Sequence, residues 1–405
     1  MAVFEHAPGH RQMPWVVLSD GSFLTPSDRS NFYGDLPLLP DGSVLTTPEN
    51  SVLGRLPSLP ENASCVGSTD NWLVLDCIDA MERHSYFLHD PFSDKTVPLH
   101  ELETVIGNVS ELFEIRKVLI RSTPNDVVAV MTNNYNYPII LILPGKGIWL
   151  PKPREPPFVY IIDIVFLGDK LYGITQSEEL VSITISFDDN NIPTVIDTER
   201  VIKHPTVSDG DSKTWSSIDV MHVLNNEALS GREGDNDDEL AEYELMKSTG
   251  DGMIFEAVHY GEEDKVPYEL PDLIITIWYF VKSREKLLMV RRQLQGPTYD
   301  VNFTRNVKVF EADIIAATWV PVTDELGGDT LFVSKYFSKS VSAYGKIEKG
   351  AIYFIDTGEV FIMRYKTISM PQRELNFRTS MWIFPPKGSG LKLENACDRA
   401  TDRAT

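Results

Sequence analysis

The stretch DIVFLGDKLYGIT, residues 163–175, contains two short apolar runs separated by a Gly-Asp pair. Runs of β-branched and aromatic residues indicate β-strands, and Gly followed by Asp is typical of a tight turn between two strands. The same order of apolar strand, turn and apolar strand recurs in YFVKSREKLLMVRR at 279–292 and in GAIYFIDTGEVFIMR at 350–364. The repeated unit therefore predicts a fold built from β-hairpins.

Alternation of apolar and polar residues supports strands outside these units. In LVSITISF, Val181, Ile183, Ile185 and Phe187 alternate with serine and threonine, which places the apolar side chains on one face of a half-buried strand. Helix signals are weak, and the strongest is the short stretch from Leu102 to Phe113. Further strand-type runs lie at 15–18, 71–75, 115–122, 127–132, 138–143, 273–281, 307–313, 329–334 and 351–356.

The spacing of the strands favours one all-β architecture over the others. Sets of about four strands recur every 40–55 residues or so, close to the roughly 40–50 residues of a propeller blade. We therefore predict an all-β fold, a β-propeller of six or seven four-stranded blades. The segment WVVLSDGSFLTP at 15–26 is expected to pair with the last blade and close the ring. The sets begin near Ser64, Ile115, Phe158, Trp215, Leu273 and Gly327.

Four segments make up the predicted domain organisation. A short N-terminal segment, 1–11, precedes a β-propeller domain at 12–385, and a tail at 386–405 has few apolar anchors and is expected to be disordered. An acidic loop insertion at 224–271 interrupts the propeller. Its centre, EGDNDDELAEYE at 233–244, has seven acidic residues of twelve and no basic one. Such a segment cannot bury enough apolar surface to fold alone, so we expect a solvated loop.

Charge and cysteine content restrict the partners and the compartment. The chain has 37 Lys and Arg against 59 Asp and Glu, a net charge of −22, which argues against nucleic acid and against a polybasic membrane anchor. Only three cysteines are present, and the first residues lack an apolar signal-peptide core. We therefore expect a protein of the cytoplasm, the nucleus or both.

A series of motifs in a fixed order resembles the KIB-type β-propeller domain of plant F-box and F-box-like proteins. The resemblance covers roughly residues 12 to 385. Two positions depart from the family pattern: Asn71 stands where the family tends to have Gly, and Asp90 where it has Asn. Asn tolerates a left-handed backbone and Asp can form an Asx-turn, so both fit the same turns. The motifs are CVGSTDNWLVLD at 65–76, FLHDPFSDKTVPLHEL at 87–102, DIVFLGDKLYGI at 163–174, YFVKSREKLLMVRR at 279–292, VFEADIIAATWVPVTDELGGDTLFVSKYFSKSVSA at 309–343 and GAIYFID at 350–356.

The resemblance implies protein recognition in the ubiquitin pathway. In such proteins the propeller holds the substrate of a ubiquitin ligase, and a separate F-box docks on the Skp1 adaptor. Only fourteen residues precede Trp15 here, so we expect no F-box and no binding of the Skp1 adaptor by this chain alone. The target protein is unknown. Two alternatives stay open: a stand-alone decoy or regulatory binding protein, and a carbohydrate-active enzyme that uses two carboxylates in the propeller channel.

The sequence points to no catalytic, cofactor-binding or metal-binding residue, and we expect no enzyme. Cys65 and Cys77 are interpreted as small core residues, and no histidine lies at zinc-ligand spacing. The acidic stretches at 188–191 and 235–238 lack the Gly and Glu positions of a calcium loop, so we interpret them as turns. Gly145-Lys146-Gly147 lacks the spacing of a phosphate-binding loop.

Aromatic residues are the remaining candidates for partner contacts. Tyr135, Tyr137 and Phe158 lie in turn-like segments where an exposed ring can anchor a partner, although ordinary loop packing is favoured. The partner-binding residues stay unknown. Tryptophans occur about once per proposed blade and are expected to pack between blades: Trp72, Trp149, Trp215, Trp278, Trp319 and Trp382.

Overall fold

The computed structural model describes most of the predicted propeller. The segment 1–11, the stretch 233–244 and the set near Trp215 lie outside the described residues, as do the insertion 224–271 except 254–257 and the tail except residue 386. The predictions for these segments therefore stay predictions. The described ranges are 14–26, 51–56, 59–60, 62–106, 114–121, 126–134, 137–151, 161–203, 254–257, 273–296, 303–323, 326–343, 347–369 and 380–386.

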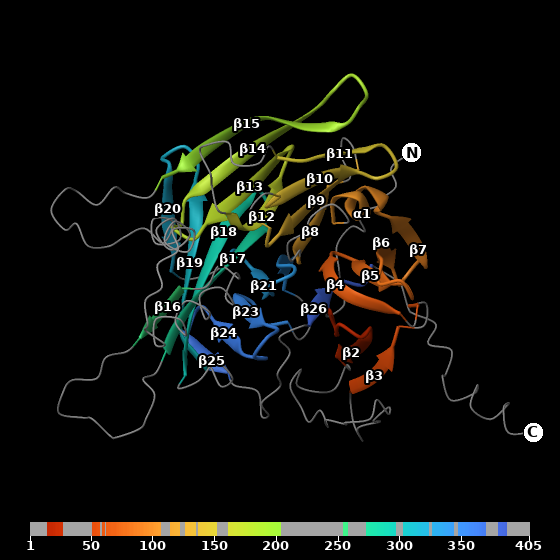
Figure 1. The fold of residues 1–405 in the computed structure, drawn as a ribbon. Helices are drawn as coiled ribbons and strands as arrows, with labels where there is room; N and C mark the ends of the chain where they lie inside the picture. Colours follow the sequence, from red (N-terminus) through yellow and green to blue (C-terminus); the bar gives the residue numbers. More distant parts are fainter. Residues whose placement is uncertain are drawn as a thin grey trace, which may run out of the picture.

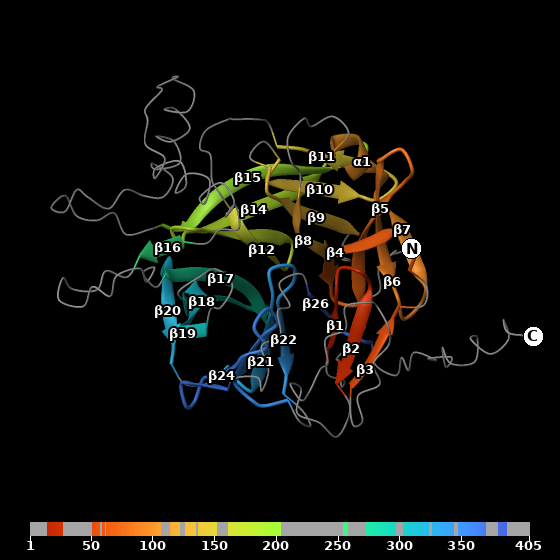
Figure 2. The same ribbon diagram turned by 60° about the horizontal axis from the view of Figure 1, so that its bottom comes forward.

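The described strands form six sheets that follow one another around a ring (Figures 1 and 2). We number the sheets 1 to 6 in chain order. Sheet 1 has the order β26-β1-β2-β3, with β26 (Met381–Ile383), β1 (Trp15–Val17), β2 (Ser22–Pro26) and β3 (Ser51–Arg55). Sheet 2 has the order β4-β5-β6-β7, with β4 (Ala63–Thr69), β5 (Trp72–Ile78), β6 (His84–Asp90) and β7 (Lys95–Pro98).

Sheets 3 and 4 repeat the order of sheet 2. Sheet 3 contains β8 (Ile115–Arg121), β9 (Val127–Thr132), β10 (Ile139–Leu143) and β11 (Gly147–Trp149). Sheet 4 contains β12 (Ile161–Leu167), β13 (Lys170–Thr175), β14 (Leu180–Phe187) and β15 (Pro193–Ile202). The hairpin of β12 and β13 is the one that DIVFLGDKLYGIT predicts, with Leu167 paired to Lys170 across the turn.

Sheets 5 and 6 have five strands each. Sheet 5 has the order β16-β17-β18-β19-β20, with β16 (Ile254–Ala257), β17 (Leu273–Ser283), β18 (Lys286–Gly296), β19 (Phe303–Asp313) and β20 (Thr318–Val322). Sheet 6 has the order β22-β21-β23-β24-β25, with β21 (Asp329–Val333), β22 (Lys339–Ser342), β23 (Ala351–Phe354), β24 (Val360–Ile362) and β25 (Thr367–Ser369).

The all-β propeller is confirmed, but its blades are not uniform. Five sheets are antiparallel throughout, as expected of propeller blades, whereas β21 and β23 in sheet 6 are parallel. The cause is local: β22 folds back antiparallel onto β21, and the chain then returns to place β23 on the other side of β21. The described residues therefore show five blades of the expected antiparallel form and not the predicted six or seven, and sheets 5 and 6 have five strands instead of the predicted four.

Both ends of the described chain meet in sheet 1. Strand β1 pairs antiparallel with β26, so that Trp15 lies opposite Ile383 and Val17 opposite Met381. This pairing confirms the expected closure of the ring by the segment at 15–26. Sheet 1 is therefore held by residues that lie more than 350 positions apart in the chain.

One helix, α1 (His100–Ile106), is found in the described residues. It begins two residues before the predicted stretch, and residues 107–113 lie outside the described part of the chain. Leu102 and Val105, three residues apart, are its buried side chains. Among the described residues, no helix has the length and apolar character needed to cross a bilayer.

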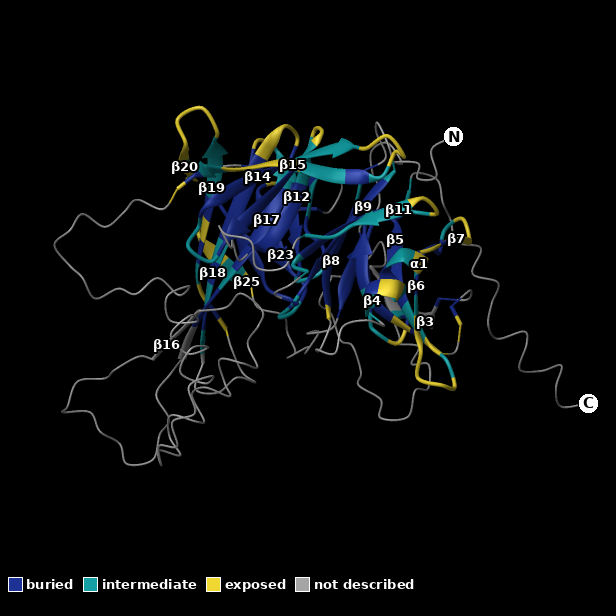
Figure 3. Ribbon diagram, turned by 45° about the horizontal axis from the view of Figure 1, so that its top comes forward, coloured by how far each residue is buried: buried dark blue, intermediate teal, exposed yellow. Residues whose placement is uncertain are grey.

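The core consists of apolar layers between neighbouring sheets (Figure 3). Tryptophans take part in these layers, as the sequence predicts. Trp382 Nε1 donates to the Val333 carbonyl at 3.2 Å and joins sheet 1 to sheet 6. Trp278 and Trp319 both donate to Glu178, at 2.9 and 2.6 Å, and join sheet 5 to the β13–β14 turn of sheet 4. Trp215 lies outside the described residues.

Candidate functional site

The aromatic candidates of the sequence can be placed only in part. Tyr137 is half-buried and packs against the apolar layer between sheets 2 and 3. Its backbone N–H donates to the side-chain oxygen of Asn134 at 3.2 Å, which holds the backbone of Tyr137 in a tight turn. Tyr137 therefore fits the loop-packing interpretation. Tyr135 and Phe158 lie outside the described residues.

The calcium-like stretch at 188–191 is a turn. Asp188 Oδ1 accepts the backbone N–H groups of Asn190 at 2.9 Å and Ile192 at 2.7 Å, so this carboxylate oxygen serves the turn itself. The stretch at 235–238 lies outside the described residues. In the part of the chain that the structure describes, His, Cys, Asp and Glu form no cluster of three that could hold a metal ion.

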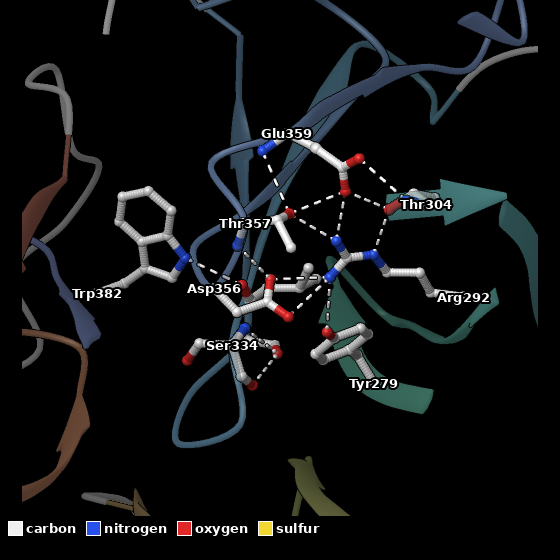
Figure 4. A network of polar contacts seen from close by, with 10 residues as sticks. Tyr279, Arg292, Thr304, Ser334, Asp356, Thr357, Glu359 and Trp382 are labelled. Carbon is white, nitrogen blue, oxygen red and sulfur yellow. Dashed lines mark hydrogen bonds and ion pairs between the residues drawn. The ribbon is translucent and has the colours of Figure 1, made fainter. Parts of the chain in front are cut away.

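A fully buried arginine is at the centre of a network of polar contacts (Figure 4). Arg292, on β18, has a side chain that is 0% exposed. Its Nη1 donates to both carboxylate oxygens of Asp356, at 2.8 and 2.9 Å, and its Nη2 donates to Glu359 Oε2 at 2.6 Å. One buried cation therefore faces two carboxylates, and the group carries a net negative charge.

Neutral groups occupy the other donors of the guanidinium. Nε donates to Thr304 Oγ1 at 2.7 Å, Nη2 to Thr357 Oγ1 at 2.6 Å, and Nη1 to the Tyr279 hydroxyl at 3.3 Å. The guanidinium also lies over the Phe354 ring, 3.9 Å from its centroid. Arg292, Thr304 and Tyr279 belong to sheet 5, and the other partners to sheet 6. The network thus joins sheet 5 to sheet 6.

The protonation states of this network follow from its charges. Burial raises the pKa of Glu359, but the charge of Arg292 and hydrogen bonds from Thr304 and Thr357 lower it by more than burial raises it. The pKa of Glu359 therefore lies below its ordinary value of 4.5. Burial lowers the pKa of Arg292, and the carboxylate of Asp356 more than restores it. Burial and the same carboxylate raise the pKa of Tyr279. At neutral pH these shifts keep Glu359 charged and keep Arg292 and Tyr279 protonated.

A second buried ion pair joins three sheets at the inner side of the ring. Lys117 Nζ, on β8, lies 2.5 Å from Asp163 Oδ1, on β12. The other oxygen of Asp163 accepts the backbone N–H of Phe280, on β17, at 2.7 Å. Burial raises the pKa of Asp163, and Lys117 counteracts part of that rise. Sheets 3, 4 and 5 are thus linked by one carboxylate.

The connection between β21 and β22 reaches across the ring. Lys335 Nζ lies 3.1 Å from Glu114 Oε1, directly before sheet 3, and Lys339 forms an ion pair with Asp70 in the β4–β5 turn of sheet 2. Neither sheet 2 nor sheet 3 is next to sheet 6 in the ring. Phe337, in the same connection, belongs to an apolar cluster with residues of sheets 1, 3 and 4. Contacts from this part of sheet 6 therefore reach four sheets: 1, 2, 3 and 4.

The two positions that depart from the family pattern contact each other. Asn71 Nδ2 donates to Asp90 Oδ2 at 2.9 Å, and both residues are buried. Asp90 Oδ1 accepts the N–H of Phe92 at 2.9 Å, which confirms the expected Asx-turn. The left-handed residue of the other turn is Asp70, with φ 49°, so the turn does not use the left-handed conformation that Asn71 would tolerate. Nineteen residues separate the pair, so the sequence alone does not reveal the contact.

Sequence reasoning missed the charged residues that join the sheets. The sequence identifies Arg292 and Lys117 only as parts of strands, because a charged residue in a strand is normally assigned to the solvent face. The only available signal was their place inside apolar runs, KLLMVRR and IRKVLIR. Their carboxylate partners lie 46 to 67 residues away in the chain.

Comparison with protein families supports the motif-based resemblance. A model of the KIB1-4 beta-propeller family matches residues 44–376. The matched range contains all described strands of sheets 2 to 6, and with them both buried ion networks. No curated protein matches the chain.

Proposed function

Because this chain belongs to the KIB1-4 beta-propeller family, as its motifs led us to expect, we propose that it is a protein-interaction module and not an enzyme. In this proposal the ring of sheets is a rigid support, and the loops at its rim hold a target protein. We count sheet 6 as a blade of the ring, because it packs against sheet 5 on one side and against Trp382 of sheet 1 on the other.

The observation that carries the proposal is the use of buried charge between sheets. Arg292 is bonded to Asp356 and Glu359, and Lys117 to Asp163. A carbohydrate-active enzyme needs a pair of carboxylates about 5–10 Å apart that can reach a sugar. The buried carboxylates of these networks are instead paired with cationic side chains of neighbouring sheets. Such contacts hold neighbouring sheets in fixed positions, which favours a rigid support for the loops at the rim of the ring.

The more specific part of the proposal concerns the ubiquitin pathway. We propose that the target is a protein whose degradation the chain controls, in the cytoplasm, the nucleus or both. Cys65 and Cys77, the two cysteines that the structure describes, form no disulfide, which is compatible with a reducing compartment. The rival is a decoy that shields the same target from degradation.

Proximity labelling with the full chain in the organism's own cells tests the proposal. Labelled proteins are identified, produced in pure form and titrated against the purified chain. We expect at least one of them to bind directly, with a 1:1 stoichiometry. If none of the purified candidates binds, the interaction function is wrong.

The half-life of the bound target separates the adaptor from the decoy. Extra copies of the chain shorten the half-life if the chain delivers its target for degradation, and lengthen it if the chain shields the target. Inhibition of the proteasome serves as the control, because both the shortening and the lengthening should disappear when the target is no longer degraded. A half-life that does not respond to the chain would contradict both roles.

A further inference from the structure

The hairpin tip between β19 and β20 is apolar and exposed. Its residues Ile314, Ile315, Ala316 and Ala317 are all exposed, and the side chain of Ile315 is 99% accessible. Figure 3 shows this connection, beside the β20 label, coloured as exposed and projecting beyond the buried sheets. A single exposed isoleucine is common, but four consecutive apolar residues at a projecting tip are not.

The tip is held in a defined conformation. Asp313 Oδ1 accepts the backbone N–H groups of Ile315 at 3.0 Å and Ala316 at 2.8 Å. Ala317 has φ 53°, in the left-handed region that disfavours residues with a side chain. A preformed turn loses little conformational freedom when a partner binds it. The tip therefore has the properties of a rigid anchor.

The apolar character is not required by the hairpin. In the corresponding turn of sheet 4, at 188–192, the four exposed residues are Asp-Asp-Asn-Asn and the half-buried fifth is Ile192, and the turn of sheet 3, at 144–146, is Pro-Gly-Lys. Both turns connect the outer strands of their sheets, as the β19–β20 turn does. Polar residues thus satisfy the same geometry elsewhere in the ring, and the isoleucines need another explanation.

Strand β20 continues the apolar surface and restricts how a partner can use it. Val320 is 45% exposed, and Pro321 beside it is also exposed. β20 is the edge strand of sheet 5, and a proline in an edge strand has no N–H to offer to an added strand. Side chains rather than backbone hydrogen bonds are therefore the means of recognition at this place.

We propose that the tip 314–317 inserts Ile315 into an apolar pocket on a partner protein whose surrounding surface is basic. The inference rests on the proposed protein-interaction function and gives it a location. We infer an apolar pocket because the exposed side chains of Ile314 and Ile315 need an apolar environment in the complex. We infer a basic surface around it because the chain has a net charge of −22 and Asp313 lies at the base of the tip. The same net charge disfavours a second copy of this chain and an anionic membrane as occupants.

The test compares variants of the full chain against its purified binding proteins. Ile315→Asp removes the apolar contact, Ile315→Leu preserves it, and Asn190→Asp places the same charge at the polar tip of sheet 4. Isothermal titration gives the affinity of each variant. We expect Ile315→Asp to weaken binding by at least about tenfold, since a buried isoleucine contributes that much or more. The other two variants are expected to bind within about twofold of the original chain. Because residues 190 and 315 are both exposed, all three variants are expected to melt at the original temperature.

Each other outcome counts against the inference in a distinct way. If purified proteins bind the chain and Ile315→Asp binds them all equally well, the tip is not the anchor, although the interaction function stands. If no purified protein binds, both proposals are wrong. A dimer of the purified chain in sedimentation velocity that Ile315→Asp dissociates would make a second copy the occupant. Binding to phosphatidylcholine vesicles that Ile315→Asp abolishes would make it a lipid surface, and either result would overturn the inference.

Discussion

The interfaces on the two sides of the ring join neighbouring sheets by different means. Between sheets 2 and 3 the described layer is apolar, with Leu88 and Val130 fully buried in it. Between sheets 5 and 6 a similar apolar layer is supplemented by Arg292 and its two carboxylates. An apolar interface depends on volume and tolerates exchange of one apolar side chain for another, whereas a buried ionic one depends on every partner. The two interfaces should therefore respond differently to mutation.

Replacement of Arg292 by methionine should have the largest effect. It leaves two carboxylates without their cation, Glu359 being only 3% exposed, and we expect a loss of about 3–5 kcal/mol in the free energy of unfolding. Urea denaturation followed by tryptophan fluorescence measures the loss. Arg291→Met is the matched control, because Arg291 is the adjacent residue, is partly exposed and pairs with Glu178 at 2.9 Å. A loss of about 1 kcal/mol or less is expected for this control. Equal losses for the two variants would contradict the difference between buried and exposed charge.

Removal of the Glu359 charge should change stability in a pH-dependent way. Because the pKa of Glu359 is below 4.5 in the folded chain, its stabilisation is present above pH 4.5 and is lost as the pH falls through the folded-state pKa. Glu359→Gln should lower the free energy of unfolding by about 1.5–3 kcal/mol at pH 7 and by less at acid pH. Urea titrations between pH 7 and pH 3 measure this change. Glu311→Gln, at the exposed Lys286–Glu311 pair, should keep the original pH dependence. A Glu359→Gln chain with the original acid slope would show that this carboxylate is not stabilised by folding.

The apolar interface between sheets 2 and 3 should tolerate replacement of one buried side chain by methionine. Leu88→Met conserves volume and polarity in the layer between sheets 2 and 3, so we expect a loss below about 1.5 kcal/mol. Thermal unfolding by circular dichroism gives the shift in melting temperature. A loss as large as that of Arg292→Met would mean that both interfaces depend on detailed fit, and the contrast between them would disappear.

The Asn71–Asp90 contact predicts a smaller, coupled effect. Asp90→Asn turns an acceptor into an amide that faces the Asn71 amide, and Asn71→Gly removes the donor. The free energy of unfolding should fall by about 0.5–1.5 kcal/mol in each single variant. The double variant has Gly at position 71 and Asn at position 90, as in the family pattern, and should regain much of this loss. A double-mutant cycle by urea denaturation measures the coupling. Strictly additive losses would show that the two departures are independent.

The sequence predicts the strands better than the contacts between sheets. Hairpins such as β12–β13 follow from local composition, because apolar runs and a Gly-Asp turn lie within thirteen residues. Closure of the ring was also predictable, since the segment at 15–26 has strand character and no neighbour of its own. The parallel pairing of β21 with β23 was not, because it depends on where β22 folds back.

The buried charges show most clearly where prediction from the sequence stops. Arg291 and Arg292 are adjacent and chemically identical, yet Arg291 is partly exposed and pairs with Glu178 of sheet 4, whereas Arg292 is fully enclosed. Alternation along β18 places them on opposite faces, but it does not say which face meets sheet 6. That choice is made by Asp356 and Glu359, which lie 64 and 67 residues away.

A double-mutant cycle of Arg292→Met and Glu359→Gln tests most directly the claim that buried charge joins the sheets. Urea denaturation at pH 7 gives the free energy of unfolding of the original chain, both single variants and the double variant. If the pair acts as one stabilising unit, the two losses should be non-additive by about 2 kcal/mol, with the double variant more stable than their sum predicts. A coupling below about 0.5 kcal/mol would contradict the claim.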